Sequence, residues 1–85
     1  MATWRELITD AFAEGDTWDT VVSCTLSSDG LDKEFEEGFG AIEGAAFTLW
    51  TAKRVYFPVC YDGAEWVGSV SREPDGVATA HVGGG

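Results

Sequence analysis

The chain has few of the side chains from which catalytic and metal sites are built. Its 85 residues include one histidine, His81, and two cysteines, Cys24 and Cys60. A hydrolase-type triad needs a base beside its nucleophile, and a single imidazole near the C-terminus does not supply that arrangement. Two cysteines without clustered histidines provide too few ligands for a zinc site. We therefore expect no enzyme activity, no cofactor and no metal. Two buried free thiols are the first expectation for the cysteines, and a disulfide is the alternative.

Long apolar runs are also missing. No stretch approaches the ~18 consecutive apolar residues needed to span a bilayer, and the opening MATWRELITD lacks the basic region and apolar core of a signal peptide. These features predict a cytoplasmic protein. An apolar content of 45% with 13% aromatic residues is nevertheless enough for a folded core, which excludes the disordered class. We expect one domain over residues 1–85, and a monomer.

Basic residues are scarce, and their shortage is uneven. The chain holds 15 acidic and 5 basic residues, a net charge of −10. Residues 1–43 carry eleven acidic against two basic residues, whereas residues 44–85 carry four against three. Such a field repels nucleic acid and membranes and speeds encounter with basic partners. The partner we expect is a protein with a basic, nucleic-acid-binding surface; the alternative is that the charge serves solubility alone.

The first predicted element is an amphipathic helix over about residues 4–13. Thr3 followed by Glu6 forms a capping-box pattern, and apolar residues then recur with helical spacing up to Phe12. Gly15 would supply the left-handed C-terminal cap. The outer face presents a row of acidic residues at i, i+4 and i+8, which are Glu6, Asp10 and Glu14.

A strand and a second, short helix are predicted next. Residues 21–26 alternate in a way that places Val22, Cys24 and Leu26 on one face. Ser27, Ser28 and Asp29 then offer capping side chains to a helix that carries Leu31 and Phe35 on one face. Its exposed face is almost wholly acidic and comprises Asp29, Asp32, Glu34, Glu36 and Glu37. The segment from Asp29 lacks the glycine and alternating oxygen ligands of an EF-hand.

Residues 47–70 predict a three-stranded antiparallel meander. Strands are expected at 47–50, at 54–59 and after Asp62-Gly63, the dipeptide typical of a type I′ hairpin turn. Pro58 cannot donate to a ladder, so its position should be a bulge or a site without a partner on that side. Residues 77–82 could add a fourth strand at an edge. The aromatic residues Trp50, Tyr56, Tyr61 and Trp66 are mostly explained by core packing.

The expected fold is therefore α+β, with two short helices packed on a three- to four-stranded antiparallel β-meander. We divide the domain into an acidic helical half over 1–43, the β-meander over 44–82 and a frayed tail over 83–85. Carboxylates along a surface can replace the phosphates that Lys and Arg side chains of a nucleic-acid-binding protein await. The two acidic helix faces are the candidate partner-binding site of such a mimic.

Several runs of the sequence support a more specific hypothesis. They are the opening TWRELI at 3–8, VVSCTL at 21–26, FTLWT at 47–51, RVYFP at 54–58 and YDGAEWV at 61–67. Read together, the chain resembles small phage- and mobile-element-encoded proteins of proteobacteria, and is similar to anti-CRISPR proteins directed at type I systems.

This resemblance implies an inhibitor that acts in the cytoplasm of the host bacterial cell. It would bind the multi-subunit effector complex (Cascade) and stop it from engaging target DNA. The matched runs are structural and carry no binding site over to this chain. A small acidic interaction module, either an antitoxin or a phage regulatory adaptor that binds a basic host protein, is the alternative.

Overall fold

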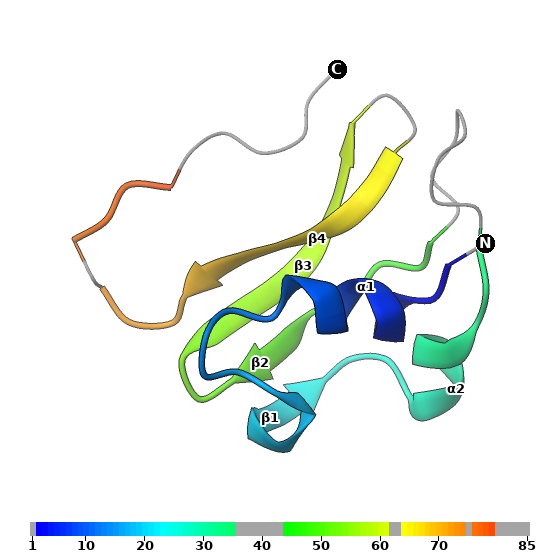
Figure 1. Cartoon of the computed structure of the whole chain (residues 1–85), viewed down its shortest axis with the longest axis horizontal. Helices are drawn as coiled ribbons and strands as arrows, with labels where there is room; N and C mark the ends of the chain where they lie inside the picture. Colours follow the sequence, from blue (N-terminus) through cyan, green and yellow to red (C-terminus); the bar gives the residue numbers. More distant parts are fainter. Residues whose placement is uncertain (1, 36–43, 62–63, 75, 80–85) are drawn as a thin grey trace.

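A computed structural model describes residues 2–35, 44–61, 64–74 and 76–79. They form a four-stranded antiparallel sheet in the order β1-β2-β3-β4, with helix α1 across one face and helix α2 beside α1 (Figure 1). This confirms the predicted α+β class. The elements are α1 (Trp4–Ala11), the 3₁₀ turn η1 (Trp18–Thr20), β1 (Val21–Cys24), α2 (Ser28–Asp32), β2 (Leu49–Thr51), β3 (Arg54–Tyr61) and β4 (Ala64–Ser71).

Helix α1 begins as predicted and ends earlier. The Thr3 hydroxyl accepts the Glu6 N–H at 3.2 Å, so the predicted cap is present. Phe12 already has an extended ψ of 128°, and the next N–H, from Ala13, donates to the hydroxyl of Tyr56 at 2.9 Å instead of continuing the helix. Gly15 has a positive φ of 90° but lies in the turn that follows, not at the helix cap. The predicted end at residue 13 is therefore wrong.

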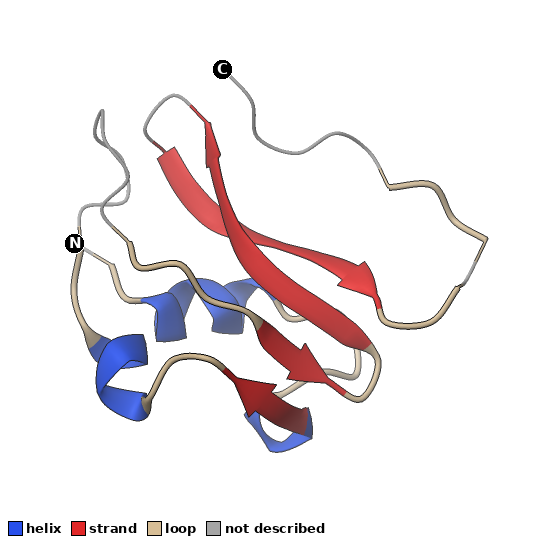
Figure 2. Cartoon of the chain, turned by 180° about the vertical axis from the view of Figure 1, so that it is seen from behind, coloured by secondary structure: helices blue, strands red, loops and turns tan. Residues whose placement is uncertain are grey.

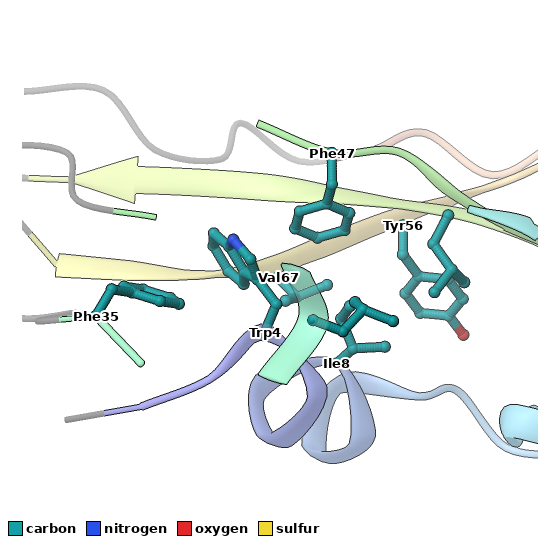
Figure 3. Packing of buried hydrophobic residues seen from close by; sticks show 8 residues of the cluster. Trp4, Ile8, Phe35, Phe47, Tyr56 and Val67 are labelled. Atoms are coloured by element: carbon teal, nitrogen blue, oxygen red, sulfur yellow. The ribbon is translucent and has the colours of Figure 1, made fainter. Parts of the chain in front are cut away.

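The core lies between α1 and the sheet. Trp4 and Ile8 project from α1 toward Tyr56 and Val67 of the sheet (Figure 3). Two aromatic rings, from residues 35 and 47, each pack with their centroid 4.8 Å from that of the Trp4 ring. Burial of the indole is completed by its N–H, which donates to the carbonyl of Ala45 at 2.9 Å. Packing of this kind, rather than helix propensity, holds a helix of eight residues in place.

The meander follows the predicted order with shifted ends. β2 occupies Leu49–Thr51 rather than 47–50, and β3 extends to Tyr61. Tyr61 pairs with Ala64 across the hairpin, and the predicted turn at Asp62-Gly63 lies outside the described residues. Pro58 is not a bulge, because its pairing with Val67 falls in a regular register. The pairing of β2 with β3 ends at Leu49 and Tyr56, so Pro58 has no β2 residue opposite it.

The fourth strand is β1, not the segment expected near the C-terminus. β1 pairs antiparallel with β2, whereas residues 77–79 form no strand and 80–82 lie outside the described residues. A register shift between Val21 and Ser23 also changes the predicted face at one position: Cys24 and Leu26 pack against the core as predicted, but Val22 does not. Val21 and Cys24 pack against the core while Val22 is 63% exposed, because the bulge interrupts the alternation between them.

Helix α2 is one turn shorter than its acidic composition suggested. The Ser27 hydroxyl accepts the Gly30 N–H at 3.2 Å and caps it, but the backbone is extended again at Lys33. Phe35 therefore lies beyond the helix, where it pairs with Ala2 in an isolated antiparallel bridge. Leu31 and Phe35 are both buried, as predicted from their spacing, although they do not share a helix.

Candidate interaction surface

The acidic residues of α1 are exposed, but they form a shorter row than expected. Glu6 and Asp10 lie one helical turn apart on the solvent side of α1. Glu14 is exposed too, yet it follows the end of the helix and so does not continue that row. The prediction of three carboxylates in line along one helix is wrong for this reason.

The second group of acidic residues is divided between a helix and the segment after it. Asp29 and Asp32 are exposed on α2, and Glu34 is exposed in the extended segment that follows. Glu36 and Glu37 lie outside the described residues. Because α1 and α2 pack against each other, the carboxylates of the two helices belong to one region of the molecule (Figure 1). We call Glu6, Asp10, Asp29, Asp32 and Glu34 the acidic surface.

A single arginine connects the two parts of this surface. The Nε of Arg5 donates to Oδ1 of Asp32 at 2.5 Å, and its guanidinium lies 5.0 Å from the centre of the Trp18 ring. The Trp18 indole N–H in turn donates to the Thr9 hydroxyl at 2.8 Å. The ion pair is largely exposed, so its contribution to stability is small. The pair holds the Asp32 carboxylate of α2 next to α1 and neutralises part of its charge.

The link that Arg5 makes between α1 and α2 was not predicted from the sequence. The charge count does indicate it, because Arg5 and Lys33 are the only basic residues among the first 43, which include eleven acidic residues. An open depression of about 430 Å³ beside Arg5 is lined by Arg5, Glu6, Thr9 and Asp10. The acidic surface therefore has a concave part on α1, in which a guanidinium or ammonium group from a partner would meet Glu6 and Asp10.

A buried carboxylate fixes the loop that follows α1. Asp16 is 7% exposed and accepts hydrogen bonds from the hydroxyls of Tyr56 at 2.7 Å, Thr51 at 3.0 Å and Thr20 at 3.2 Å. Burial raises the pKa of Asp16, but these three hydroxyl donors and the charge of Lys53 outweigh it, so the pKa lies below its ordinary value. Asp16 is therefore ionised at neutral pH and serves the fold.

The pKa of the Tyr56 phenol is shifted in the opposite direction, above its ordinary value. Burial raises the pKa of Tyr56, and the hydrogen bond to the Asp16 carboxylate and its charge raise it further, against the opposing Ala13 N–H. Tyr56 is thus held protonated as a donor. A buried carboxylate and a buried phenol can suggest acid–base chemistry, but here each satisfies the other and neither lines one of the cavities found along the described chain.

A second buried carboxylate lies at the other end of the sheet. Glu65 is 5% exposed and accepts the Gly44 N–H at 3.1 Å. It projects from the same side of the β3–β4 hairpin as Val67, and it lines a cavity of about 170 Å³ with Pro58 and Cys60. Cys24 and Cys60 are both free thiols, and each is half-buried rather than buried.

The face of the sheet away from α1 is apolar and partly exposed. Figure 2 shows this face in front of α1. Phe57 and Val59 lean over Gly68, where an added Cβ would lie 2.8 Å from a Val59 methyl group. Their neighbour Trp66 is 38% exposed, so the core packing expected for most of the four aromatic residues does not cover its side chain. We call this region, built around Phe57, Val59 and Trp66, the outer sheet face.

The part of the chain that the structure describes offers neither a metal cluster nor a membrane-spanning helix. In residues 2–35, 44–61, 64–74 and 76–79, no group of three or more His, Cys, Asp or Glu side chains is placed to hold a metal ion. Within the same ranges, no helix is long and apolar enough to cross a membrane. Comparisons with protein-family models, with curated proteins and with solved structures found no match.

Proposed function

We propose that this chain is an anti-CRISPR protein, which binds a type I effector complex (Cascade) and blocks its binding to target DNA through the acidic surface. The observation that supports this proposal most directly is the packing of α1 against α2, which gathers exposed carboxylates from two separate segments into one region. The DNA-binding channel of an effector complex is lined with Lys and Arg side chains that bind phosphates. Carboxylates placed in this channel form charge-assisted pairs with those side chains and exclude the DNA.

The proposed inhibitor acts by occupancy and performs no chemistry. The carboxylates of the acidic surface are exposed, so their partner supplies the apolar surroundings that strengthen the pairs on binding. The Arg5–Asp32 pair makes Asp32 a weaker contributor, and Glu6, Asp10, Asp29 and Glu34 carry most of the contact. The chain's own negative field disfavours direct binding to nucleic acid, so the partner is the protein part of the complex.

The experiment that tests this proposal has two parts. Tagged protein is used to capture complexes from cells that express type I effectors of several subtypes, and the captured effector is then assayed for target-DNA binding with and without the inhibitor. Co-purification together with lost DNA binding is the expected result. Failure to co-purify with any subtype would overturn the proposal and favour the alternative, an acidic antitoxin or regulatory adaptor that binds a basic host protein.

Co-purification with unchanged DNA binding would be informative in a different way. It would place the block at a later step, such as nuclease recruitment, and the DNA-mimicry part of the proposal would then be wrong. A useful control is the effector challenged with an unrelated protein of similar size and net charge, because nonspecific acidic proteins also associate with basic surfaces at low salt. The measurements should therefore be made near physiological ionic strength.

A further inference from the structure

The end of the sheet opposite the β3–β4 turn gathers three of the five basic residues of the chain. Lys53 lies in the turn between β2 and β3, Arg54 begins β3, and Arg72 directly follows β4. The backbone N–H of Arg72 donates to the carbonyl of Lys53 at 2.9 Å, which holds the three positions together. Although the chain has 15 acidic residues, these three cations form no ion pair in the part of the molecule that the structure describes.

A cavity opens beside this cluster. Its volume is about 550 Å³, and its wall combines Arg54, Ser69, Ser71 and Arg72 of the sheet end with Val77 and Thr79 of the segment that follows β4. In Figure 1 this segment, drawn in orange and red, leaves the end of β4 and turns back toward the opposite end of that strand. The cavity is thus walled by cationic and hydroxyl groups on one side and by a short stretch of chain on the other.

The guanidinium of Arg54 is fixed and still has capacity to bind. Its Nε donates to the Ser69 hydroxyl at 2.9 Å, which sets the plane of the group, and its side chain is half-buried. No hydrogen bond of its two terminal nitrogens occurs among the described residues. Arg72 uses one terminal nitrogen for the carbonyl of Thr51 at 2.7 Å. The two terminal nitrogens of the Arg54 guanidinium form one free edge with two N–H donors, which matches the two oxygens of a carboxylate or phosphate.

The described acidic groups nearest this cluster, Glu73 and Asp16, do not already serve as its anion. Glu73 is part of the cavity wall, but it is exposed and forms no ion pair with Arg54 or Arg72. The charge of Lys53 helps to lower the pKa of Asp16. The carboxylate oxygens of Asp16 nevertheless accept their hydrogen bonds from Thr20, Thr51 and Tyr56. A partly desolvated guanidinium without a carboxylate partner among the residues that the structure describes favours an added anion.

We propose that this cavity binds an oxyanion, namely a carboxylate or phosphate group of a small ligand, with Arg54 as its principal partner and Arg72 as the second cation. This site is distinct from the acidic surface on α1 and α2 and does not depend on the function proposed for that surface. The nearly balanced charge of residues 44–85, three basic against four acidic, makes an anion site feasible in a chain whose net charge is −10.

The test is an NMR titration of ¹⁵N-labelled protein with sodium phosphate and, separately, with sodium acetate, each compared with sodium chloride at equal ionic strength. We expect saturable shifts at the Arg54 Nε–H and at the amides of Ser69 and Arg72. Shifts with phosphate alone identify a phosphate site, and shifts with acetate alone identify a carboxylate site. Shifts no larger than those caused by chloride would overturn the proposal.

Matched variants separate binding from a general charge effect. Arg54→Gln keeps a group able to hydrogen-bond Ser69 but removes the cation, and we expect at least about tenfold weaker anion binding. Lys33→Gln makes the same change in net charge at an exposed site on the acidic half, and binding should be unchanged. If Arg54→Gln does not fold, Arg72→Gln provides the same comparison. Equal affinity of wild type and a folded Arg54→Gln or Arg72→Gln variant would contradict the assignment.

Discussion

The phenol hydroxyl of Tyr56 donates a 2.7 Å hydrogen bond to the carboxylate of Asp16, which lies 40 positions earlier in the chain. The same hydroxyl accepts the N–H of Ala13 at 2.9 Å, so one side chain in the middle of β3 holds both the end of α1 and the loop after it. Asp16 is further bound by hydroxyls of η1 and β2. This network orients α1, and with it Glu6 and Asp10 of the acidic surface, relative to the sheet.

Removal of the Tyr56 hydroxyl should therefore weaken the fold without creating a cavity. Tyr56→Phe keeps the ring, which packs edge-to-face on Phe12 with centroids 5.4 Å apart, but leaves the Ala13 N–H without an acceptor and Asp16 with one donor fewer. We expect a loss of about 1–3 kcal/mol in the free energy of unfolding, measured by urea denaturation. Ser28→Ala, which removes an exposed hydroxyl, is the control and should change stability by less than about 0.5 kcal/mol. An equally small change for Tyr56→Phe would contradict this role.

Asp16 should make the free energy of unfolding depend on pH in the acidic range. Its pKa is lower in the folded chain than in the unfolded chain, so ionised Asp16 stabilises the fold at neutral pH. That contribution is lost as the pH falls below the unfolded value of about 4 and through the lower folded value. The stability difference between wild type and Asp16→Asn should thus be large at pH 7 and shrink below about pH 4. Urea unfolding at several pH values measures it, and Asp19→Asn controls for the lost charge. A difference that does not change with pH would refute the argument.

Gly44 is required by close packing, which distinguishes it from Gly30. A Cβ at position 44 would lie 2.6 Å from Cζ2 of Trp4 and 3.0 Å from Oε1 of Glu65, both of which are buried. Gly44→Ala should cost about 1–3 kcal/mol in unfolding free energy, because the buried indole must move. At Gly30 in α2 the nearest group is the flexible end of Leu26 at 3.2 Å, and alanine there gains helix propensity. We expect Gly30→Ala to be neutral or stabilising by up to about 1 kcal/mol. Equal effects of the two changes in thermal or urea unfolding would show that the contact at Trp4 is not decisive.

Local patterns predicted the beginnings of elements better than their ends. The Thr3 cap, the apolar spacing of Trp4 and Ile8 and the hairpin that joins β3 to β4 all depend on residues close in sequence, so they could be read directly. The end of α1 depends on the hydroxyl of Tyr56, 43 positions from Ala13, and no local signal encodes that contact. For the same reason, α2 was extended too far on the strength of its composition.

The candidate site shows the same division between local and distant information. Exposure of Glu6, Asp10, Asp29, Asp32 and Glu34 was predicted from composition, and the structure confirms it. The pairing of Arg5 with Asp32, 27 positions apart, required the packing of α1 against α2. Asp16, in contrast, lies in a short polar stretch that carries no local sign of burial. Its burial arises because β2 and β3 bring Thr51 and Tyr56 to that loop, which the sequence pattern does not indicate.

Charge reversal on the acidic surface provides the most direct test of the proposed inhibitor. Asp10 and Glu34 are exposed, lie outside the first turn of either helix and make no described ion pair, so their replacement should leave the fold intact. Asp10→Lys combined with Glu34→Lys changes the net charge by four units. We expect the affinity for the effector complex to fall at least about tenfold, about 1.4 kcal/mol, because two attractive contacts become repulsive.

The matched control is Asp19→Lys combined with Glu73→Lys, which changes the net charge equally at exposed positions outside the acidic surface. Binding of both double variants and of wild type is measured by calorimetry at two salt concentrations. Wild type and control should bind alike and weaken as salt rises, whereas the variant of the acidic surface should bind weakly and depend less on salt, since it forms fewer ion pairs. Equal losses in both double variants would mean that net charge alone drives binding. Unchanged binding in both would move the contact to the outer sheet face, where Trp66→Ala would then be the informative substitution.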